Sequence, residues 1–401
     1  MCNVVVFPRS ARIFLVEKKL VFFYTICMIT LTELAQFFAE SEHFSGAARE
    51  DEILAGHTTM HVGGKARLFL GPADECSLVF AIAELKRAGF PYFVLGGGSN
   101  LIISDSGFDG AIISTRGLKK VESLTKNPSY PCHPNASYLI AGAGAAWGSV
   151  MAFCREHDLG GLEGFTGLSG TVGGALYMNA TCFGLSACDR LVSVRYLDTE
   201  SGEIGEYVMD EEKRTADWGY KKSPFQSADG RGWAQIGGVT GESPVEGVAQ
   251  NGSEADGWSE GENSPLEKNI ERTSPAIILL SATFALTKGF DAVKSDDCIA
   301  QRKEKGHFLA PSAGSVFKNV VQDGASGGVI AGKVIDECGL KGLQIGGAQV
   351  APWHGNFIVN TGDASAQDIF DLVQLVRKIV QEKRGILLEC EIIFVGMFFV
   401  H

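Results

Sequence analysis

The spacing of apolar and polar positions along the chain predicts several helices. In residues 366–384, apolar side chains recur every three or four positions and so form one apolar face. Ser365 and Asp368 match a capping box at the start of this helix, and Gly385 stands where it ends. The same periodicity predicts further helices at 74–88 (ended by Gly89), 147–157, 291–305 and around 331–338.

Short apolar runs between these helices predict strands. The clearest runs lie at 138–144 and 275–286, and residues 191–209 read as a strand pair. A final strand is expected at 386–395. It carries Glu389 and Glu391, which are two residues apart and therefore share a face. From residue 54 to residue 103 the order is strand, helix, strand, glycine turn, strand, which predicts a small α/β unit.

The glycine turn within residues 94–103 has the pattern of a phosphate-binding loop. Gly96–Gly98 carry no side chains and permit positive φ, so backbone N–H groups can face a phosphate directly. Ser99 and Asn100 add side-chain donors at the same place. A Rossmann turn needs G-x-G-x-x-G at the start of a helix, but Leu101 takes the third glycine position and another apolar run follows. The pattern predicts a strand–turn–strand cradle.

A second glycine-rich segment, Gly161–Gly184, lies in the first half of the chain. Glycine costs about 1 kcal/mol against alanine inside regular elements, so such a segment is expected where backbone turns sharply or approaches something closely. Its apolar residues, among them Phe165 and Leu176, argue against a solvated loop.

Charge and cysteine content narrow the function classes. The chain has 401 residues and a formal net charge of −12, so it lacks the basic footprint of a nucleic-acid-binding protein. Its length and its 45% hydrophobic content imply two or three domains. The ten cysteines contain no C-x-x-C pair, so we expect reduced thiols and no metal site.

Two segments stand apart from this core. Residues 1–31 combine basic residues with an apolar run that is too short for a membrane span, which needs about 20 residues. Because no clear cleavage site follows, we favour a start at Met28, or an unimportant N-terminal extension, over a signal peptide. Residues 226–274 are rich in glycine and acidic residues and lack periodic apolar positions, so we expect a disordered insertion there.

Six motifs in order resemble the UDP-N-acetylenolpyruvoylglucosamine reductase (UDP-N-acetylmuramate dehydrogenase) family. They are TTMHVGGKA (58–66), VLGGGSNLI (94–102), GTVGGALYMNA (170–180), SAGSVFKN (312–319), FIVNTG (357–362) and LECEIIFVG (388–396). Each motif alone is a weak pattern, but six in register over residues 54–396 are very specific. The helix that follows the strand at 275–286 directly, with no tyrosine-bearing loop, resembles the shorter, second type of these reductases.

The resemblance implies an α+β fold. A two-part FAD-binding region of the PCMH/VAO type is followed by a C-terminal α/β substrate-binding domain. The expected divisions are an N-terminal extension and helix (1–53), FAD subdomain 1 (54–120), FAD subdomain 2 (121–225), the insertion (226–274), and the end of the FAD region with the substrate domain (275–401).

The resemblance also implies a reaction in two steps. NADPH reduces FAD, and the flavin then passes hydride to C3 of the enolpyruvyl ether of UDP-N-acetylglucosamine. Proton delivery at C2 completes UDP-N-acetylmuramate, a peptidoglycan precursor. This chemistry requires an acid near C2 and donors aimed at the charge that develops on the substrate.

The family motifs assign roles to residues of this chain. Ser315, the second serine of SAGS, is the expected proton donor, and Glu391 matches the catalytic glutamate, although Glu389 competes for that role. Lys221, in YKKSPF, stands where the family has an arginine that stabilises the enolate. Lysine is a mobile point charge without the planar grip of arginine, so this replacement is not conservative.

Further residues are assigned by the same resemblance. For substrate binding they are Tyr220, Asn319 and Lys303, with Lys305 as an alternative to Lys303. For FAD binding they are Thr59, Val62, Gly63, Gly96, Gly97, Gly98, Ser99, Asn100, Leu101, Gly170, Thr171, Gly173, Gly174 and Asn179.

Two other functions stay open at this level: another flavin oxidoreductase of the same fold, and a catalytically silent UDP-sugar-binding protein. For the favoured enzyme we expect FAD and NADPH as cofactors, a small-molecule substrate, no nucleic-acid or membrane partner, a cytoplasmic location and a monomeric state.

Overall fold

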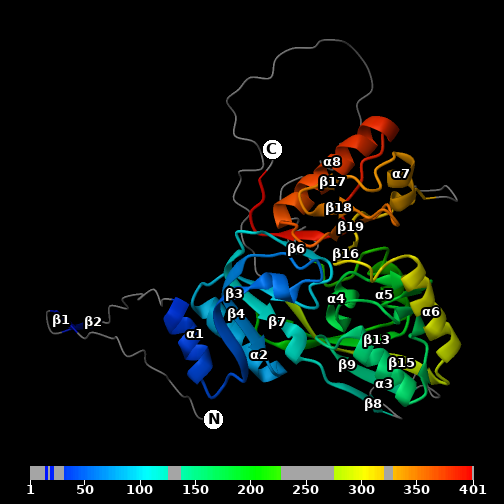
Figure 1. Ribbon diagram of the computed structural model, residues 1–401. Helices are drawn as coiled ribbons and strands as arrows, with labels where there is room; N and C mark the ends of the chain where they lie inside the picture. Colours follow the sequence, from blue (N-terminus) through cyan, green and yellow to red (C-terminus); the bar gives the residue numbers. More distant parts are fainter. Residues whose placement is uncertain are drawn as a thin grey trace, which may run out of the picture.

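The computed structural model describes residues 31–124, 137–226, 275–319 and 328–399, together with the paired short strands β1 (Phe14–Val16) and β2 (Lys19–Val21) (Figure 1). The expected insertion, apart from its first residue, and most of the N-terminal extension lie outside this description. No helix in the described part of the chain combines the length and the apolar character that a membrane crossing requires.

The first unit is a mixed four-stranded sheet covered by two helices. Its strands, in spatial order, are β3 (Gly46–Ile53), β4 (Lys65–Pro72), β7 (Phe108–Ser114) and β5 (Tyr92–Leu95), and its helices are α1 (Leu31–Glu40) and α2 (Glu75–Arg87). Asp74 caps the start of α2, since its side chain accepts a hydrogen bond from the amide of Ser77, and Gly89, with φ 63°, follows its end. Because β3 belongs to this sheet, the unit begins well before residue 54.

The second unit is built on antiparallel strands from two distant parts of the chain. Its spatial order is β14 (Ile204–Val208), β13 (Leu191–Asp198), β15 (Ile277–Lys288), β9 (Ser137–Gly142) and β8 (Val121–Leu124), with β10 (Leu159–Gly160) also paired to β15. Its helices are α3 (Trp147–Glu156), α4 (Val172–Tyr177), α5 (Glu211–Ala216) and α6 (Ala292–Glu304), and a hairpin joins β11 (Thr181–Cys182) to β12 (Leu185–Ser186). Trp147 and Phe165 lie at the centre of its core.

The third unit is an antiparallel sheet with a long helix packed against it. Its strands, in spatial order, are β16 (Ser312–Ser315), β19 (Phe357–Asn360), β18 (Ala348–Val350) and β17 (Gln344–Ile345), and its helices are α7 (Ala331–Glu337) and α8 (Ala366–Arg384). Helix α8 buries its apolar face against this sheet. Figure 1 shows the unit, in orange and red, above the other two.

The end of the chain ties the third unit to the first. Strand β20 (Ile393–Val395) pairs in parallel with β6 (Leu101–Ile103), the strand that leaves the glycine turn. Met60, Val62 and Ile102 belong to the core of the third unit. Segments almost 300 residues apart in sequence therefore meet beside the glycine turn.

Most predicted elements are confirmed, but the final strand is shorter than expected. The predicted helices at 74–88 and 366–384 are present with their caps, including the Ser365–Asp368 capping box. By contrast, only Ile393–Val395 of the predicted strand 386–395 is regular. Ahead of it, Cys390 forms an isolated bridge with Phe317, because the backbone at 389–391 bonds to the loop after β16 instead of to a neighbouring strand.

Replacing Ser365 with alanine should weaken the third unit. The change removes the side-chain acceptor for the Asp368 amide, so we expect a loss of about 1 kcal/mol in the free energy of unfolding measured with urea. Ser365→Asn, which keeps an N-cap acceptor, should stay close to the wild type. Equal losses in both variants would show that the cap does not carry the effect.

Candidate active site

The glycine turn between β5 and β6 has no room for side chains. A Cβ at Gly97 would lie 2.5 Å from the Cα of Gly170, and a Cβ at Gly96 would lie 2.8 Å from the hydroxyl of Thr171. Gly98 has φ 65°, and a Cβ there would overlap the carbonyl oxygen of His57. The turn therefore needs glycine for both conformation and close approach, and the two glycine-rich segments touch here.

Hydrogen bonds fix the turn on three sides. Asn100 donates from Nδ2 to the carbonyl oxygen of Glu391 at 3.0 Å, and its own carbonyl accepts the amide of Ile393 at 2.9 Å. Arg116 donates to the carbonyl oxygen of Gly97 at 3.0 Å, and the amide of Thr59 donates to that of Gly98 at 3.1 Å. The side chain predicted to donate to a ligand thus holds the segment that carries Glu391.

A first cavity opens between the two glycine-rich segments. Most of the predicted cofactor residues line it, namely Gly96, Gly97, Gly98, Ser99, Asn100, Leu101, Gly170, Thr171, Gly173 and Gly174. Apolar side chains such as Phe93, Leu168 and Ile393 complete its walls. Bare backbone suits a pyrophosphate and apolar walls suit a flat ring system, so the residues present fit FAD.

Four residues predicted to bind the cofactor lie outside the lining of this cavity. Val62 is buried in the core of the third unit, and a Cβ on Gly63 would meet Leu54 and Ile103. The hydroxyl of Thr59 donates to the carbonyl oxygen of Ser312 at 2.6 Å. Asn179 is buried and donates to the carbonyl oxygen of Gly219 at 2.8 Å. These four residues support the walls of the cavity and do not line it. Thr59 and Asn179 use their side chains to bind backbone carbonyl oxygens, and Val62 and Gly63 pack against apolar residues.

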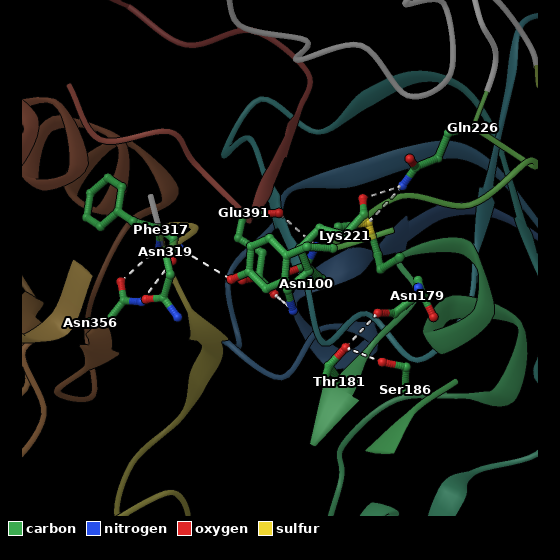
Figure 2. Close-up of polar contacts among 12 residues, drawn as sticks. Asn100, Asn179, Thr181, Ser186, Lys221, Gln226, Phe317, Asn319, Asn356 and Glu391 are labelled. Carbon is green, nitrogen blue, oxygen red and sulfur yellow. Dashed lines mark hydrogen bonds and ion pairs between the residues drawn. The ribbon is translucent and has the colours of Figure 1, made fainter. Parts of the chain in front are cut away.

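The three predicted catalytic residues come together from three separate segments. Ser315 ends β16, Lys221 lies in the turn after Trp218, and Glu391 precedes β20. Figure 2 shows Lys221 and Glu391. All three line the first cavity and also a second, neighbouring one. They therefore occupy the junction of the two cavities.

Lys221 and Glu391 form a close ion pair at this junction. Lys221 Nζ lies 2.5 Å from Glu391 Oε1, and each side chain is 12% exposed. Burial raises the pKa of the Glu391 carboxyl, while the ammonium of Lys221 partly offsets that rise. Glu391 consequently keeps its proton to higher pH than an exposed glutamate does.

Burial also separates Glu391 from its competitor Glu389. The side chain of Glu389 is 62% exposed and pairs with Lys318 instead of Lys221. Glu389 does not line either cavity, whereas Glu391 lines both. The geometry favours Glu391 as the carboxyl that meets a ligand.

A tight turn positions Lys221. Gly219 and Lys222 exchange backbone hydrogen bonds, and Lys221 between them has φ 57°, a left-handed conformation that is strained for lysine. Asn179 holds the carbonyl oxygen of Gly219, and Gln226 donates to that of Lys221 at 3.2 Å. These bonds hold the strained turn and direct Lys221 towards Glu391 (Figure 2).

The second cavity contains two of the predicted substrate residues. The amide of Asn319 donates to the Tyr220 hydroxyl at 3.2 Å, and both residues line the cavity. Lys303 is exposed on α6 and does not line either cavity. The alternative, Lys305, is also exposed and does not line either cavity. On that helix the buried positions are Ser295, Cys298 and Arg302, so helical spacing turns Arg302 inward and Lys303 outward.

Several residues at the cavities were not predicted. Arg302 and His307 line the first cavity, and Lys333, Trp353 and His354 line the second. His354 accepts the amide of Asn356 at Nδ1, and burial lowers its pKa, so at neutral pH it is a neutral ring with its proton on Nε2. The helical period of α6 could have revealed Arg302. His307, Trp353 and His354 lie in loops, for which the sequence carries no periodic pattern, and Lys333 lies on α7.

Comparison with known proteins matches two regions of the chain to known protein families. Residues 66–206 match the model of the FAD binding domain family, and residues 305–395 match that of the UDP-N-acetylenolpyruvoylglucosamine reductase C-terminal domain. The first segment contains both glycine-rich segments of the first cavity. The second contains Ser315, Asn319 and Glu391.

Whole-chain similarity extends the match. The chain is 39% identical over 344 residues to the UDP-N-acetylenolpyruvoylglucosamine reductase of Treponema denticola, covering 84% of this chain and 90% of the relative. It is 34% identical to the Treponema pallidum protein of the same name, covering 87% and 93%. The crystal structure of UDP-N-acetylenolpyruvylglucosamine reductase from Thermus caldophilus aligns with a TM-score of 0.58 at 26% identity, covering 88% of this chain and all of that one.

Adding one methyl group to the turn should disrupt the first cavity. Gly97→Ala forces the turn away from Gly170, so we expect FAD binding to weaken at least about tenfold, measured by titrating the apoprotein with FAD. Gly148→Ala is the matched control, because a Cβ at this helical position meets nothing within 4 Å. Unchanged FAD affinity in Gly97→Ala would contradict the close-approach argument.

Proposed function

The chain belongs to the UDP-N-acetylenolpyruvoylglucosamine reductase family, and from this premise we propose which residues of its two cavities carry out the reaction. It is an FAD-containing oxidoreductase that acts in peptidoglycan precursor synthesis. It reduces the enolpyruvyl ether of UDP-N-acetylglucosamine to UDP-N-acetylmuramate with electrons from NADPH.

One observation supports the assignment of residues above all others. Ser315, Lys221 and Glu391 are the residues that the reaction calls for, and they line both cavities where these meet. The first cavity is the FAD site, lined by the two glycine-rich segments. The second is the UDP-sugar site, lined by Tyr220 and Asn319. A substrate in the second cavity then presents its enolpyruvyl group to the flavin at the junction.

Each residue at the junction has a distinct task. FAD bound in the first cavity would supply the hydride-transfer chemistry that connects NADPH with C3 of the enolpyruvyl group. Lys221 binds the substrate carboxylate, onto which the negative charge spreads, and so stabilises the enolate. Ser315 gives its proton to C2. Glu391, which lines the same junction and pairs with Lys221, is assigned to assist this proton transfer, which an unassisted serine hydroxyl performs poorly.

The surrounding residues bind and orient. Gly96–Gly98 and Gly170–Gly174 present backbone to the FAD pyrophosphate, and Ser99 adds a hydroxyl beside it. Tyr220 and Asn319, joined by their hydrogen bond, form one wall for the UDP-sugar. Asn100 and Asn179 act indirectly, since they hold the backbone that carries Glu391 and Lys221. For the whole protein we propose a cytoplasmic monomer, which suits a nucleotide-sugar substrate made inside the cell.

Ser315→Ala should separate the two half-reactions. Flavin reduction by NADPH should keep its rate, because no proton is delivered to C2 in that step. Flavin reoxidation by the UDP-sugar should slow about 10²–10⁴-fold, the usual contribution of a general acid, in anaerobic stopped-flow experiments.

The control for this experiment is Ser312→Ala in the same strand, since Ser312 does not line either cavity. Equal slowing of both half-reactions in Ser315→Ala would rule out its role as the proton donor.

Lys221→Met should slow reoxidation about 100-fold or more. The change removes one charged donor from the transition state, which typically costs about 3 kcal/mol, and it leaves Glu391 buried without its partner. Lys221→Arg should retain activity at or above the wild-type rate, because arginine offers two parallel donors to a carboxylate.

Lys222→Met provides the control, because Lys222 is the exposed neighbour in the same turn. If Lys221→Met turned over as fast as Lys222→Met, the proposed role of Lys221 would be wrong.

A further inference from the structure

Thr181 lies at the junction of the two cavities, and none of the roles described above falls to it. Among the residues that the structure describes, four line both cavities, namely Thr181, Lys221, Ser315 and Glu391. Thr181 begins the short strand β11, and the residue is exposed. A ligand group that spans the two cavities therefore passes beside Thr181 as well as beside the other three residues.

Two neighbours hold the hydroxyl of Thr181 in place (Figure 2). Its Oγ1 lies 3.0 Å from the Oγ of Ser186, the residue directly opposite in the β11–β12 hairpin. It also donates to the backbone carbonyl oxygen of Asn179 at 3.3 Å, which is a long bond for a hydroxyl donor. A threonine hydroxyl has one proton and two acceptor lone pairs, so Ser186 can donate to Thr181 while the Thr181 proton turns to a stronger acceptor.

Asn179 connects this hydroxyl to the turn that carries Lys221. The backbone carbonyl of Asn179 accepts the Thr181 hydroxyl, and its side chain donates to the carbonyl oxygen of Gly219 at 2.8 Å. Asn179 itself is buried, with 3% of its surface exposed. Thr181 and Lys221 therefore reach the junction on a common support, one with a hydroxyl and the other with an ammonium group.

The substrate carboxylate, placed at this junction, has more acceptor sites than Lys221 alone can fill. A carboxylate has two oxygens with about four acceptor sites, whereas Lys221 is a point charge that also contacts Glu391. Negative charge on the carboxylate grows as the enolate forms, so a second donor would act most strongly in the transition state. Ser315 gives its proton to C2, which leaves Thr181 as the hydroxyl donor for the carboxylate.

We propose that the Thr181 hydroxyl donates a hydrogen bond to the substrate carboxylate beside Lys221, so that a hydroxyl and an ammonium group together bind its two oxygens. The proposal rests on the proposed function, because it takes the junction as the place of the enolpyruvyl group. Ser186 completes the arrangement by donating to Thr181 Oγ1 when the Thr181 proton turns to the ligand. Thr181 is thus a substrate-binding residue whose contribution grows as negative charge develops.

Thr181→Val tests this role, because valine keeps the branched shape of the side chain and lacks the hydroxyl. We expect flavin reoxidation by the UDP-sugar to slow about 10- to 100-fold, the usual effect of losing a hydrogen bond to a charged group. Flavin reduction by NADPH should keep its rate in the same anaerobic stopped-flow experiments. Thr181→Ser, which keeps the hydroxyl, should stay close to the wild type. Equal slowing in both variants would assign the effect to packing and overturn the proposal.

A second variant tests whether Thr181 and Lys221 share one carboxylate. Arginine offers two parallel donors to a carboxylate, so Lys221→Arg combined with Thr181→Val should recover most of the reoxidation rate that Thr181→Val loses. No recovery in the combined variant would contradict the shared carboxylate.

Thr215→Val is the matched control for the loss of a hydroxyl. The hydroxyl of Thr215 bonds to backbone within α5, and the residue does not line either cavity, so both half-reactions should keep their rates. If Thr181→Val reoxidised as fast as Thr215→Val, the proposal would be wrong. A wild-type protein whose reduced flavin is not reoxidised by the UDP-sugar would instead overturn the proposed function.

Discussion

The close approach of two backbone segments at Gly97 and Gly170 is the constraint on which the rest of the structure depends. One segment leaves the first sheet and the other leads into α4 of the second unit, so this contact determines how the two units meet. The absence of side chains at the contact creates the first cavity and leaves its walls as bare backbone. A fold that could accept side chains here would hold the two units further apart and lose the cavity that we propose for the cofactor.

The proposed catalytic glutamate, Glu391, depends on the same turn through Asn100. Its side chain holds the carbonyl oxygen of Glu391, and its backbone begins the pairing of β6 with β20. These contacts hold the segment before β20 against the glycine turn between β5 and β6. They thereby place Glu391 at the junction of the two cavities. Lys221 reaches the same point from another segment, held by Asn179 in a strained turn. The glycine turn and the position of Glu391 are thus mechanically linked, while a separate set of hydrogen bonds positions Lys221.

Periodic features of the sequence predicted the fold well. The helices at 74–88 and 366–384 were recognisable from apolar spacing and caps, because local interactions determine both. The final strand was predicted too long, because its length depends on which distant backbone pairs with it. Within the site, the glycines of the first cavity were predictable from the conformational freedom that only glycine offers. Thr59 and Asn179 were assigned to the cofactor but bond to backbone, and Arg302 was missed in favour of its exposed neighbour Lys303. The contacts of Thr59 and Asn179 are with segments distant in sequence, to which no local pattern corresponds, whereas the helical period of α6 could have revealed Arg302.

The central claim is that one chain transfers electrons from NADPH through FAD to a UDP-sugar enolpyruvyl ether at the junction of two cavities. The most direct test is NADPH oxidation by the purified protein under anaerobic conditions, with and without UDP-N-acetylglucosamine enolpyruvate. The account predicts oxidation of one NADPH for each molecule of this substrate added, and no sustained oxidation without it. A flavin-loaded protein whose NADPH consumption ignores the substrate would contradict the account.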